Sequence, residues 1–341
     1  MPILLASALS TKAAADALPV VRWEGRTMGS PYTVQVVGAD LPPVALDSLR
    51  ADVETRLKEI NRQMSHYEPD SELSRFNRAP ADEPFPVSPE FARVVSFSLN
   101  MARRSDGAFD PTLGPLINLW GFGEQGALRE APTHAEIQSA RAKTGWRHVE
   151  VTSRGELVKH LPALGLNLSA VAKGFAVDEV VALLARRGWT NVYVAIAGEV
   201  RVRGVSPRSG RWRVGIAAPV DQWREDDPFA AVAELSDCAI STSGDYQKFL
   251  RDPEGRRLGH ILDPRTGRPA DNTVAGVSVV APDSMTADAL GTTLFVMGET
   301  DGLRFVDDWP GAAALFILRE PNGSYRQVAS RRFRALTGYQ P

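Results

Sequence analysis

The amino-acid sequence predicts an α+β fold in which antiparallel or mixed sheets carry flanking helices. Segments with strand character often follow one another directly, and helical segments interrupt them at irregular intervals. A doubly wound parallel sheet would instead alternate strands and helices regularly. The chain has 341 residues, of which 43% are hydrophobic, so it is long enough for two domains, or two halves of one unit, around a sizeable core.

The composition excludes several classes of protein. The formal net charge is −2 and no basic stripe is present, so the sequence predicts no nucleic-acid partner. No apolar run reaches the roughly 18 residues of a spanning helix, which predicts no membrane-spanning segment. Cys238 is the single cysteine, so a disulfide within the chain and a zinc site made of cysteines are excluded. With five scattered histidines, the metal that the sequence favours is a hard cation on oxygen ligands.

Residues 1–22 are predicted to be a disordered tail or the remnant of an export signal. Their first part has a short apolar run, and small residues follow between Ala13 and Ala17, as at a signal cleavage site. The positively charged start that such a signal carries is missing, so both interpretations stay open.

Helices are predicted where apolar residues recur at helical spacing or follow a capping residue. The first runs from Leu46 to Met64 and presents one apolar stripe. The polar, turn-rich segment 64–78 is predicted to be a loop. Each of three further helices begins at a serine or threonine, and Thr133 with Glu136 has the spacing of a capping box. These three are expected over 88–104, 133–145 and 169–187, and a last helix over 284–298.

Strands are predicted where apolar and polar residues alternate, or where a short apolar run stands between turn residues. The first covers 30–38. The segments 191–204 and 211–219 are interpreted as strands joined by a turn. A further strand is expected over 273–282, and strands close the chain from 313 onward.

Residues 121–126, GFGEQG, match the G-x-G-x-x-G pattern of dinucleotide-binding loops. That pattern should follow a strand and open a helix. Here two prolines precede it, and Pro132 separates it from the next helix start. We therefore interpret it as a glycine-rich turn. No Walker A pattern is present, so a P-loop nucleotide site is not supported.

The helix start in 167–179, NLSAVAKGFAVDE, is a candidate anion site. Small residues there allow backbone to approach a ligand, and free N–H groups at a helix N-terminus suit a phosphate. Lys173 lies in the first turn, where the helix dipole disfavours a cation unless an anion binds beside it. The alternative is a solvated lysine on an amphipathic helix.

Asp288 and Thr292 are four residues apart and therefore share one helix face. A carboxylate and a hydroxyl together suit Mg²⁺, which prefers oxygen ligands and keeps waters or substrate phosphates for the rest. The alternative is that Asp288 only complements the dipole in the first helical turn.

His260 stands in LGHILDPRTGRPA, a loop framed by prolines and a glycine. A histidine has an unperturbed pKa near 6.5 and so suits proton transfer at neutral pH. It is either a packing residue beside a turn or a base at the edge of a site. The other histidines have weaker claims, because His134 falls in the capping box and His148 and His160 flank an expected strand pair.

Eight segments in order resemble one family, the ApbE family of FAD:protein FMN transferases, between about residues 25 and 300. They are TMGSPYTVQV, MSHYEPDSELSRFN, GAFDPTLGPLINLWGFG, LNLSAVAKGFAVDEV, VYVAIAGEVRVRG, ISTSGDYQKF, HILDPRTGRP and APDSMTADALGTTLFVMG. No single segment is decisive, and their shared order carries the resemblance. It implies that residues 23–341 form a single domain of two intertwined subdomains, with an FAD cleft between them.

The resemblance also implies an activity and a set of site residues. Such enzymes bind FAD and Mg²⁺, pass the FMN half to a threonine or serine hydroxyl of a target protein, and release AMP. The implied FAD site consists of Met28, Tyr67, Ala108, Phe109, Asp110, Asn167, Lys173, His260 and Ile261. The implied metal ligands are the carbonyls of Ala170 and Gly291 with the side chains of Asp288 and Thr292. His260 and Asp288 are the implied catalytic residues, His260 acting as base at the target hydroxyl.

The sequence departs from the family pattern at a few positions. Glu199 stands where the usual AGG turn has its second glycine, and it would be strained if that position required a positive φ. Its charge would also stand near phosphates. Asn167 and Ser169 replace an aspartate and a glycine, and Ser30 replaces a threonine. These departures leave two alternatives open, an FAD pyrophosphatase that yields FMN and AMP, and a non-catalytic FAD-binding protein.

The expected partner is a membrane or periplasmic redox subunit that carries the acceptor threonine or serine. The family and the N-terminal segment favour a periplasmic protein, or one associated with the inner membrane and facing the periplasm. A cytoplasmic location stays open.

Overall fold

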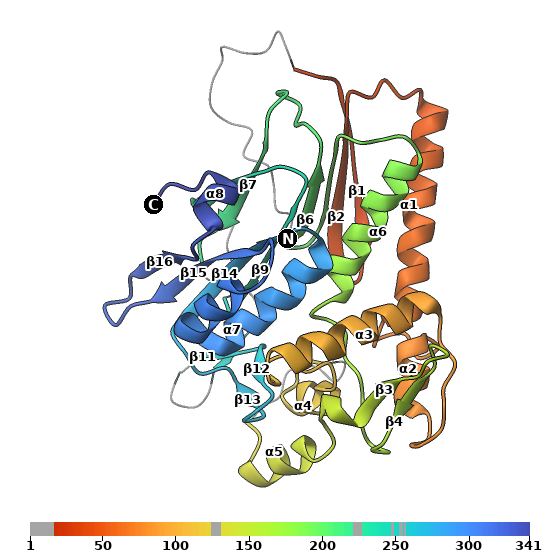
Figure 1. Ribbon diagram of the computed structural model, residues 1–341, viewed down its shortest axis with the longest axis vertical. Coiled ribbons are helices and arrows are strands. Elements are labelled where there is room, and N and C mark those ends of the chain that lie inside the picture. The colour runs from red at the N-terminus through yellow and green to blue at the C-terminus, as the bar shows by residue number, and fades with distance from the viewer. Residues whose placement is uncertain (1–16, 124–130, 221–226, 247–248, 252–254, 256) are drawn as a thin grey trace.

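The computed structural model describes residues 17–123, 131–220, 227–246, 249–251, 255 and 257–341. Within them, eight strands form one sheet in the order β1-β2-β5-β6-β9-β14-β15-β16, and every neighbouring pair is antiparallel (Figure 1). The strands are β1 Val20–Thr27, β2 Ser30–Val37, β5 Val192–Ile196, β6 Glu199–Arg203, β9 Ala239–Gly244, β14 Val274–Ala281, β15 Ala313–Arg319 and β16 Tyr325–Ala329. The prediction of an α+β fold with an antiparallel sheet is confirmed.

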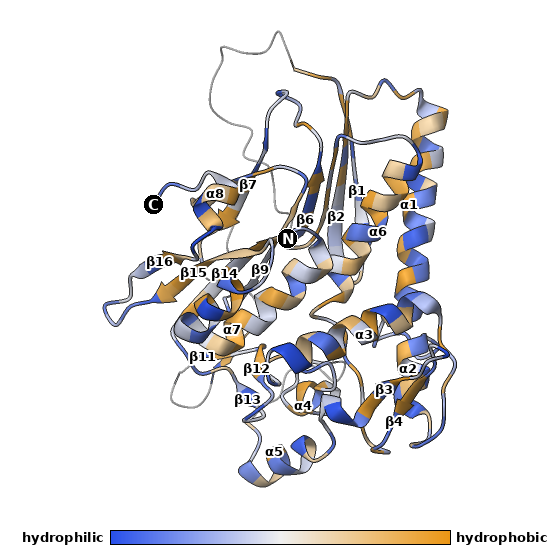
Figure 2. Ribbon diagram, viewed as in Figure 1, coloured by the Kyte–Doolittle hydropathy of each residue, from blue (hydrophilic) through white to orange (hydrophobic). Residues whose placement is uncertain are grey.

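Both faces of this sheet are covered. Strand β5 shows the arrangement, since Val194 packs with the helices on one face while Tyr193 packs with the β7–β8 hairpin on the other. A strand buried on both faces reads as a continuous apolar run, as β5 does. The covering elements are α1 Pro43–Met64, α6 Ala172–Arg186 and α7 Ser284–Asp307 on the first face, and β7 Trp212–Ala217, β8 Phe229–Leu235 and α8 Phe333–Thr337 on the second. Figure 2 shows hydrophobic residues alternating with hydrophilic ones along α1.

A smaller, mainly helical part of the chain lies beyond the end of α1 and beside α7 (Figure 1). It consists of α2 Glu72–Arg78, α3 Pro89–Arg104, α4 Gly114–Leu119, α5 His134–Arg141, the 3₁₀ turn Trp146–His148, and the hairpin β3 Val149–Val151 with β4 Leu157–Lys159. Two short hairpins adjoin it, β10 Phe249–Arg251 with β11 Arg257–Gly259, and β12 Leu262–Asp263 with β13 Arg268–Pro269. Most of this smaller part, from α2 to β4, lies between α1 and α6 in the chain, and both of these helices pack on the large sheet. The smaller part is therefore an insertion into the larger one.

Several element predictions need correction. The segment 64–78 is not all loop, because Ser71 caps α2 by accepting a hydrogen bond from Ser74 N, and Leu73 and Phe76 of that helix are buried. The helix expected from 169 begins only at Ala172, so Ser169 does not cap it. The strand expected over 191–204 is the hairpin β5–β6, while β7 belongs to a separate pair with β8.

Helix ends also differ from expectation. The capping box of Thr133 and Glu136 is confirmed, but α5 ends at Arg141 rather than at Gly145. Helix α7 continues past 298 to Asp307, although Gly298 interrupts it with a φ of 77°. The chain ends with α8 after β16 rather than with strands alone.

The segment 1–22, predicted to be a tail or the remnant of an export signal, lies only partly within the described residues. Residues 1–16 lie outside the described residues, but Val20 and Val21 already belong to β1 and pair with Val37 and Val36. None of the described helices is both long enough and apolar enough to span a lipid bilayer.

Candidate active site

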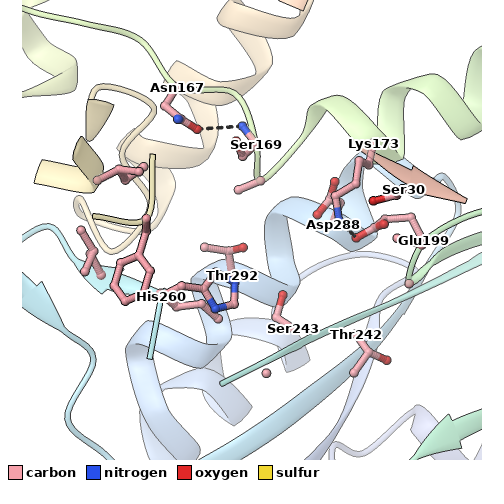
Figure 3. Close-up of a pocket in the computed structure, with 18 of the residues that line it drawn as sticks. Ser30, Asn167, Ser169, Lys173, Glu199, Thr242, Ser243, His260, Asp288 and Thr292 are labelled. Atoms are coloured by element: carbon pink, nitrogen blue, oxygen red, sulfur yellow. Dashed lines mark hydrogen bonds and ion pairs between the residues drawn. The ribbon is translucent and has the colours of Figure 1, made fainter. Parts of the chain in front are cut away.

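A cavity of about 450 Å³ opens between the large sheet, α7 and the smaller part of the chain. This size suits a cofactor or a nucleotide-like ligand. Most of the site residues that the sequence predicts line it, and they come from segments far apart in the chain (Figure 3). They are Tyr67, Ala108, Phe109, Asp110, Asn167, Ala170, Lys173, His260, Ile261, Asp288 and Thr292.

Two predicted site residues do not line the cavity. Met28 occupies the turn between β1 and β2 with a φ of 49° and packs against the hydrophobic core. Gly291 lies on the buried side of α7, where an added Cβ would stand 2.7 Å from Ser243 Oγ. Gly291 therefore lets α7 approach β9 closely. Their contacts with FAD and with a metal stay predictions.

Lys173 and Glu199, which both line the cavity, form an ion pair. Lys173 Nζ lies 2.7 Å from Glu199 Oε1, and the glutamate side chain is only 4% exposed. Burial lowers the pKa of Lys173, but the opposing charges of Glu199 and Asp288 outweigh this, so that the pKa is raised overall and the lysine stays charged. The cation expected in the first turn of α6 is thus held by a carboxylate of β6, and it is not a solvated surface lysine.

The strain considered for Glu199 lies instead at Ala197. Glu199 is the first residue of β6 and has no positive φ, whereas Ala197 has a φ of 51°. The left-handed residue of the hairpin between β5 and β6 is therefore Ala197, two positions before Glu199, where the sequence analysis considered it. Glu199 is an ordinary strand residue whose carboxylate points into the cavity beside Lys173 (Figure 3).

Asp288 provides a buried carboxylate in the second turn of α7. Its Oδ2 accepts a hydrogen bond from the backbone N–H of Gly174 at 3.0 Å. Burial and then the nearby charge of Glu199 raise the pKa of Asp288 to about 8, against the opposing influence of Lys173 and of the Gly174 N–H. Thr292, one turn further along α7, lines the same cavity. A buried carboxylate and a hydroxyl are hard oxygen donors, so these residues fit Mg²⁺.

Asp178 fixes the relative positions of the three elements that carry these charges. Its carboxylate on α6 accepts the N–H groups of Ser284 and Met285 at the start of α7, both at 2.9 Å. It also pairs with Arg201 of β6 at 2.6 Å. Burial is the main cause that raises the pKa of Asp178, to about 6. One buried side chain thus joins α6, β6 and α7.

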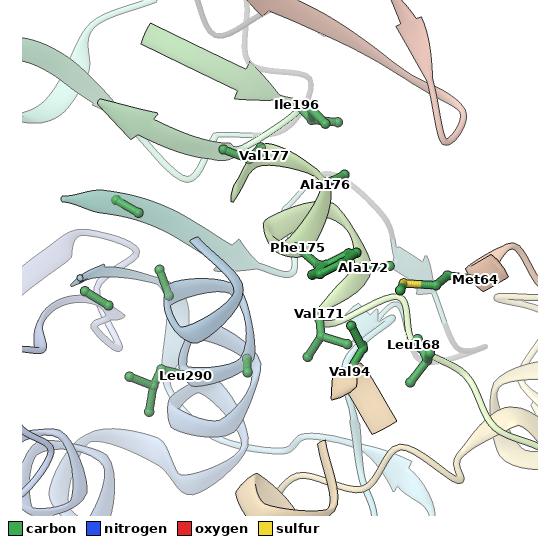
Figure 4. Close-up of a cluster of buried hydrophobic side chains, with 14 of the residues drawn as sticks. Met64, Val94, Leu168, Val171, Ala172, Phe175, Ala176, Val177, Ile196 and Leu290 are labelled. Carbon is green, nitrogen blue, oxygen red and sulfur yellow. The ribbon is translucent and has the colours of Figure 1, made fainter. Parts of the chain in front are cut away.

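Hydrophobic packing anchors the start of α6 behind the site. Leu168, Val171 and Phe175 are buried against α3 and α1, where they meet Val94 and Met64 (Figure 4). The sequence folds this way because a run of small and apolar residues leads directly into the helix. The packing fixes the backbone that presents Ala170 and Lys173 to the cavity.

The loop before α6 is held by backbone hydrogen bonds. Asn167 N–H donates to the carbonyl of Pro111 at 2.7 Å, and Asn167 Oδ1 accepts from Ser169 N–H at 3.0 Å (Figure 3). Asn167 therefore closes a local turn of the kind that asparagine favours. An asparagine at this position keeps this hydrogen bond without carrying a negative charge.

Asp110 has its side chain turned into the protein. It accepts hydrogen bonds from Thr112 N–H at 2.8 Å, from the Thr112 hydroxyl at 2.6 Å and from Trp146 N–H at 3.2 Å. Burial nevertheless raises its pKa. The carboxylate holds the turn that presents Ala108 and Phe109 to the cavity.

His260 lies between β11 and β12 and lines the cavity. Its ring meets the edge of Phe122 with centroids 6.3 Å apart. The following turn is closed by hydrogen bonds from Gly267 N–H to the Asp263 carbonyl at 2.8 Å and from Ala270 N–H to the Ile261 carbonyl at 2.9 Å. The proline-glycine frame thus forms a well-bonded loop that holds the imidazole at the cavity wall.

Other lining residues were not predicted as site residues. Phe122 belongs to the glycine-rich segment 121–126, of which residues 124–126 lie outside the described residues, and Phe229 with Gly215 comes from the β7–β8 hairpin. An added Cβ on Gly215 would stand 2.4 Å from the Phe229 ring, so this glycine lets the ring approach β7 closely. Only the pairing of β7 with β8 reveals this contact, because the two residues are far apart in sequence. His66 also lines the cavity, with its ring 4.0 Å from that of Tyr67.

Comparisons with known proteins agree with this geometry. A model of the ApbE family matches residues 28–316. The FAD:protein FMN transferase of Vibrio cholerae is 38% identical over 97% of this chain and 97% of its own, and that of Salmonella typhimurium is 37% identical over 88% and 85%. Among solved structures, the flavin transferase ApbE of Vibrio cholerae has a TM-score of 0.84 at 36% identity, covering 94% of this chain and 99% of its own.

The apo form of the flavinyl transferase ApbE of Pseudomonas stutzeri has the same TM-score of 0.84 at 35% identity, covering 95% of this chain and 99% of its own. These similarities extend over nearly the whole chain, including every segment that lines the cavity. The chain therefore belongs to the ApbE family.

Proposed function

We propose that the protein transfers the FMN half of FAD to a threonine or serine hydroxyl of an acceptor protein, assisted by Mg²⁺, and releases AMP. One observation carries the proposal. Lys173, Asp288 and His260, a cation, a buried carboxylate and an imidazole, line a single cavity of nucleotide size. The relatives named FAD:protein FMN transferase support the flavin as substrate and a protein as acceptor.

Asp288 and Thr292, with the carbonyl of Ala170, would hold Mg²⁺. When bound, the ion supplies positive charge that neutralises the phosphate oxygens as the transfer proceeds. Lys173 adds a second positive charge from the first turn of α6. It is held in place by Glu199, so its ammonium is oriented before the substrate arrives.

His260 would act as the general base. A ring nitrogen takes the proton of the acceptor hydroxyl while the hydroxyl oxygen bonds to the flavin-side phosphorus. The bond from that phosphorus to the bridging oxygen breaks, and AMP leaves with the electron pair. The product carries FMN on a phosphoester. A positioned base of this kind contributes roughly 10²–10⁴-fold to the rate.

The acceptor that we propose is a redox subunit at the membrane or in the periplasm, and the enzyme would face the periplasm. The support is the family resemblance and the apolar, small-residue segment at the start of the chain. Fractionation of the cells that make the protein, followed by detection of the protein and of flavin-labelled bands in the same fraction, tests both points.

Intact-mass measurement tests the transfer. The protein is incubated with FAD, Mg²⁺ and a candidate acceptor, and we expect a mass increase on the acceptor equal to FMN less one water. Asp288→Ala should lose Mg²⁺-dependent turnover far more than FAD binding. Absence of an adduct on every acceptor tried contradicts the transferase. Rapid release of AMP without an acceptor would identify a pyrophosphatase instead.

A further inference from the structure

Glu199 has one carboxylate oxygen that the fold leaves unsatisfied. Oε1 accepts from Lys173 Nζ at 2.7 Å, but Oε2 is buried and accepts no hydrogen bond from any residue that the structure describes. The side chain is 4% exposed and lines the cavity. A buried polar atom without a partner costs free energy, and the cost is greater for a charged group. An oxygen aimed into a ligand cavity is satisfied when the ligand supplies a donor.

A metal ion is a poor partner for Oε2. The ammonium of Lys173 already occupies the other oxygen of the same carboxylate. A divalent cation on Oε2 would stand within about 5 Å of that ammonium, where two positive charges repel strongly in a partly buried site. Asp288 carries no such ammonium within ion-pair distance among the described residues, so it is the better carboxylate for the metal.

A phosphate is excluded as well, because its oxygens are acceptors with negative charge and would repel a carboxylate. The partner of Oε2 must therefore be a neutral donor that lies close to the phosphates bound near Lys173. In a flavin dinucleotide the donors nearest to the diphosphate are hydroxyl groups, on the adenosine ribose at one end and on the ribityl chain at the other. Carboxylates bind sugar hydroxyls in this way in other dinucleotide sites.

We propose that Glu199 is a substrate-recognition residue whose Oε2 accepts a hydrogen bond from a sugar hydroxyl next to the diphosphate, while Oε1 holds Lys173. This inference rests on the proposed FAD site. One side chain would then orient the cation for the phosphates and select for a hydroxylated sugar beside them. Glu199, which the sequence analysis treats as a departure from the family pattern, thereby becomes part of the binding site.

Binding of deoxygenated FAD analogues tests the proposal. Dissociation constants are measured for FAD and for analogues that lack the adenosine 2′-hydroxyl, the adenosine 3′-hydroxyl or the ribityl hydroxyls, with the wild type and with Glu199→Ala. We expect one analogue to bind the wild type about 10- to 100-fold more weakly than FAD, as for a hydrogen bond to a charged group. That ratio should fall to near one in Glu199→Ala, and the analogue concerned identifies the hydroxyl.

Control variants separate this role from general damage. Glu54→Ala, on the exposed face of α1, should keep the full ratio of the dissociation constants for the analogue and for FAD. If Glu199→Ala does not fold, Glu199→Gln preserves the shape of the side chain and should reduce this ratio. The inference is overturned if the wild type binds every analogue as tightly as FAD, or if the ratio persists in both Glu199 variants. It is also overturned if Glu199→Ala abolishes Mg²⁺ binding to the FAD-free protein as Asp288→Ala does. Failure of the wild type to bind FAD would instead contradict the proposed function.

Discussion

The backbone N–H of Gly174 donates a hydrogen bond of 3.0 Å to Oδ2 of Asp288, which joins the first turn of α6 directly to the carboxylate of α7. The bond is possible because the two helices cross almost in contact. A Cβ added to Gly174 would stand 2.3 Å from the carbonyl oxygen of Ser284. The site geometry therefore depends on the absence of a side chain at one position of α6.

Gly174→Ala should destabilise the protein by about 1–3 kcal/mol, because an overpacked contact between two backbones forces the helices apart. Displacement of α6 should also weaken Mg²⁺ binding. Thermal unfolding and calorimetric titration measure the two effects. Gly210→Ala is the matched control, since Gly210 is exposed and an added Cβ meets only one atom at 4.0 Å. Equal unfolding temperatures for the two variants contradict the packing argument.

Asp288→Asn should change how the stability of the metal-free protein depends on pH. The pKa of Asp288 rises from 3.8 to about 8 on folding. Between these two pH values the folded wild type therefore holds a proton that the unfolded chain has lost. Its stabilising contribution is present at low pH and is lost as the pH rises toward 8. The asparagine cannot ionise. The difference in unfolding temperature between variant and wild type should therefore grow in favour of the variant from pH 5 to pH 8, roughly the span of this titration.

Differential scanning fluorimetry in chelator across this pH range measures that difference. Added Mg²⁺ should reverse the order at the upper end, because the ion binds the ionised carboxylate of the wild type alone. A difference that is constant with pH would show that Asp288 titrates at its ordinary value.

His260→Ala should keep FAD binding and lose transfer. We expect a dissociation constant for FAD close to that of the wild type and a transfer rate lower by roughly 10²–10⁴-fold, since the base is removed without disturbing the phosphate contacts. His134→Ala, on the exposed start of α5, serves as the control and should transfer normally. Normal transfer by His260→Ala would make this histidine a packing residue beside Phe122.

Ala197→Gly should stabilise the protein. Ala197 has a φ of 51°, a conformation that costs a residue with a Cβ about 1 kcal/mol and glycine almost nothing. The greater flexibility of glycine in the unfolded chain offsets part of the gain, so we expect a rise of a few tenths to about 1 kcal/mol. Ala195→Gly, in the middle of β5, should lower the stability instead. Chemical denaturation of both variants gives the comparison, and a loss of stability in each argues against strain at Ala197.

Lys159→Met should be strongly destabilising. Lys159 in β4 is 1% exposed, and its ammonium donates to the carbonyls of Asn77, Pro162 and Leu164 at 2.7, 3.1 and 3.2 Å. Burial lowers its pKa. Without the ammonium these carbonyls lose their donor, which we expect to cost about 3 kcal/mol. Lys58→Met, exposed on α1, should change the unfolding free energy little. A similarly small change for Lys159→Met would contradict the role of Lys159 as the donor to these three carbonyls.

Local sequence features predicted the elements that depend on near neighbours. The capping box of Thr133 and Glu136 and the proline start of α3 appear where expected, because such hydrogen bonds join residues three positions apart. Helix α2 was missed, since its Ser71 cap stands in a polar, turn-rich segment. Only two of its buried residues, Leu73 and Phe76, are apolar, which is too few to form a recognisable stripe. The start of α6 was placed too early because the turn of Asn167 and Ser169 imitates a cap.

The sequence by itself determined the α+β class with antiparallel or mixed sheets, the placement of Asp288 and Thr292 on one helix face, and the cation near the start of a helix. These follow from periodicity and from contacts within a single turn. Only the tertiary structure decided that Glu199 holds Lys173, that Ala197 and not Glu199 has the left-handed backbone, and that Phe229 lines the cavity. Such contacts join β6, α6, α7 and the β7–β8 hairpin across the core. Their geometry is set by how the layers pack, and packing distances between distant segments leave no periodic signal in the chain.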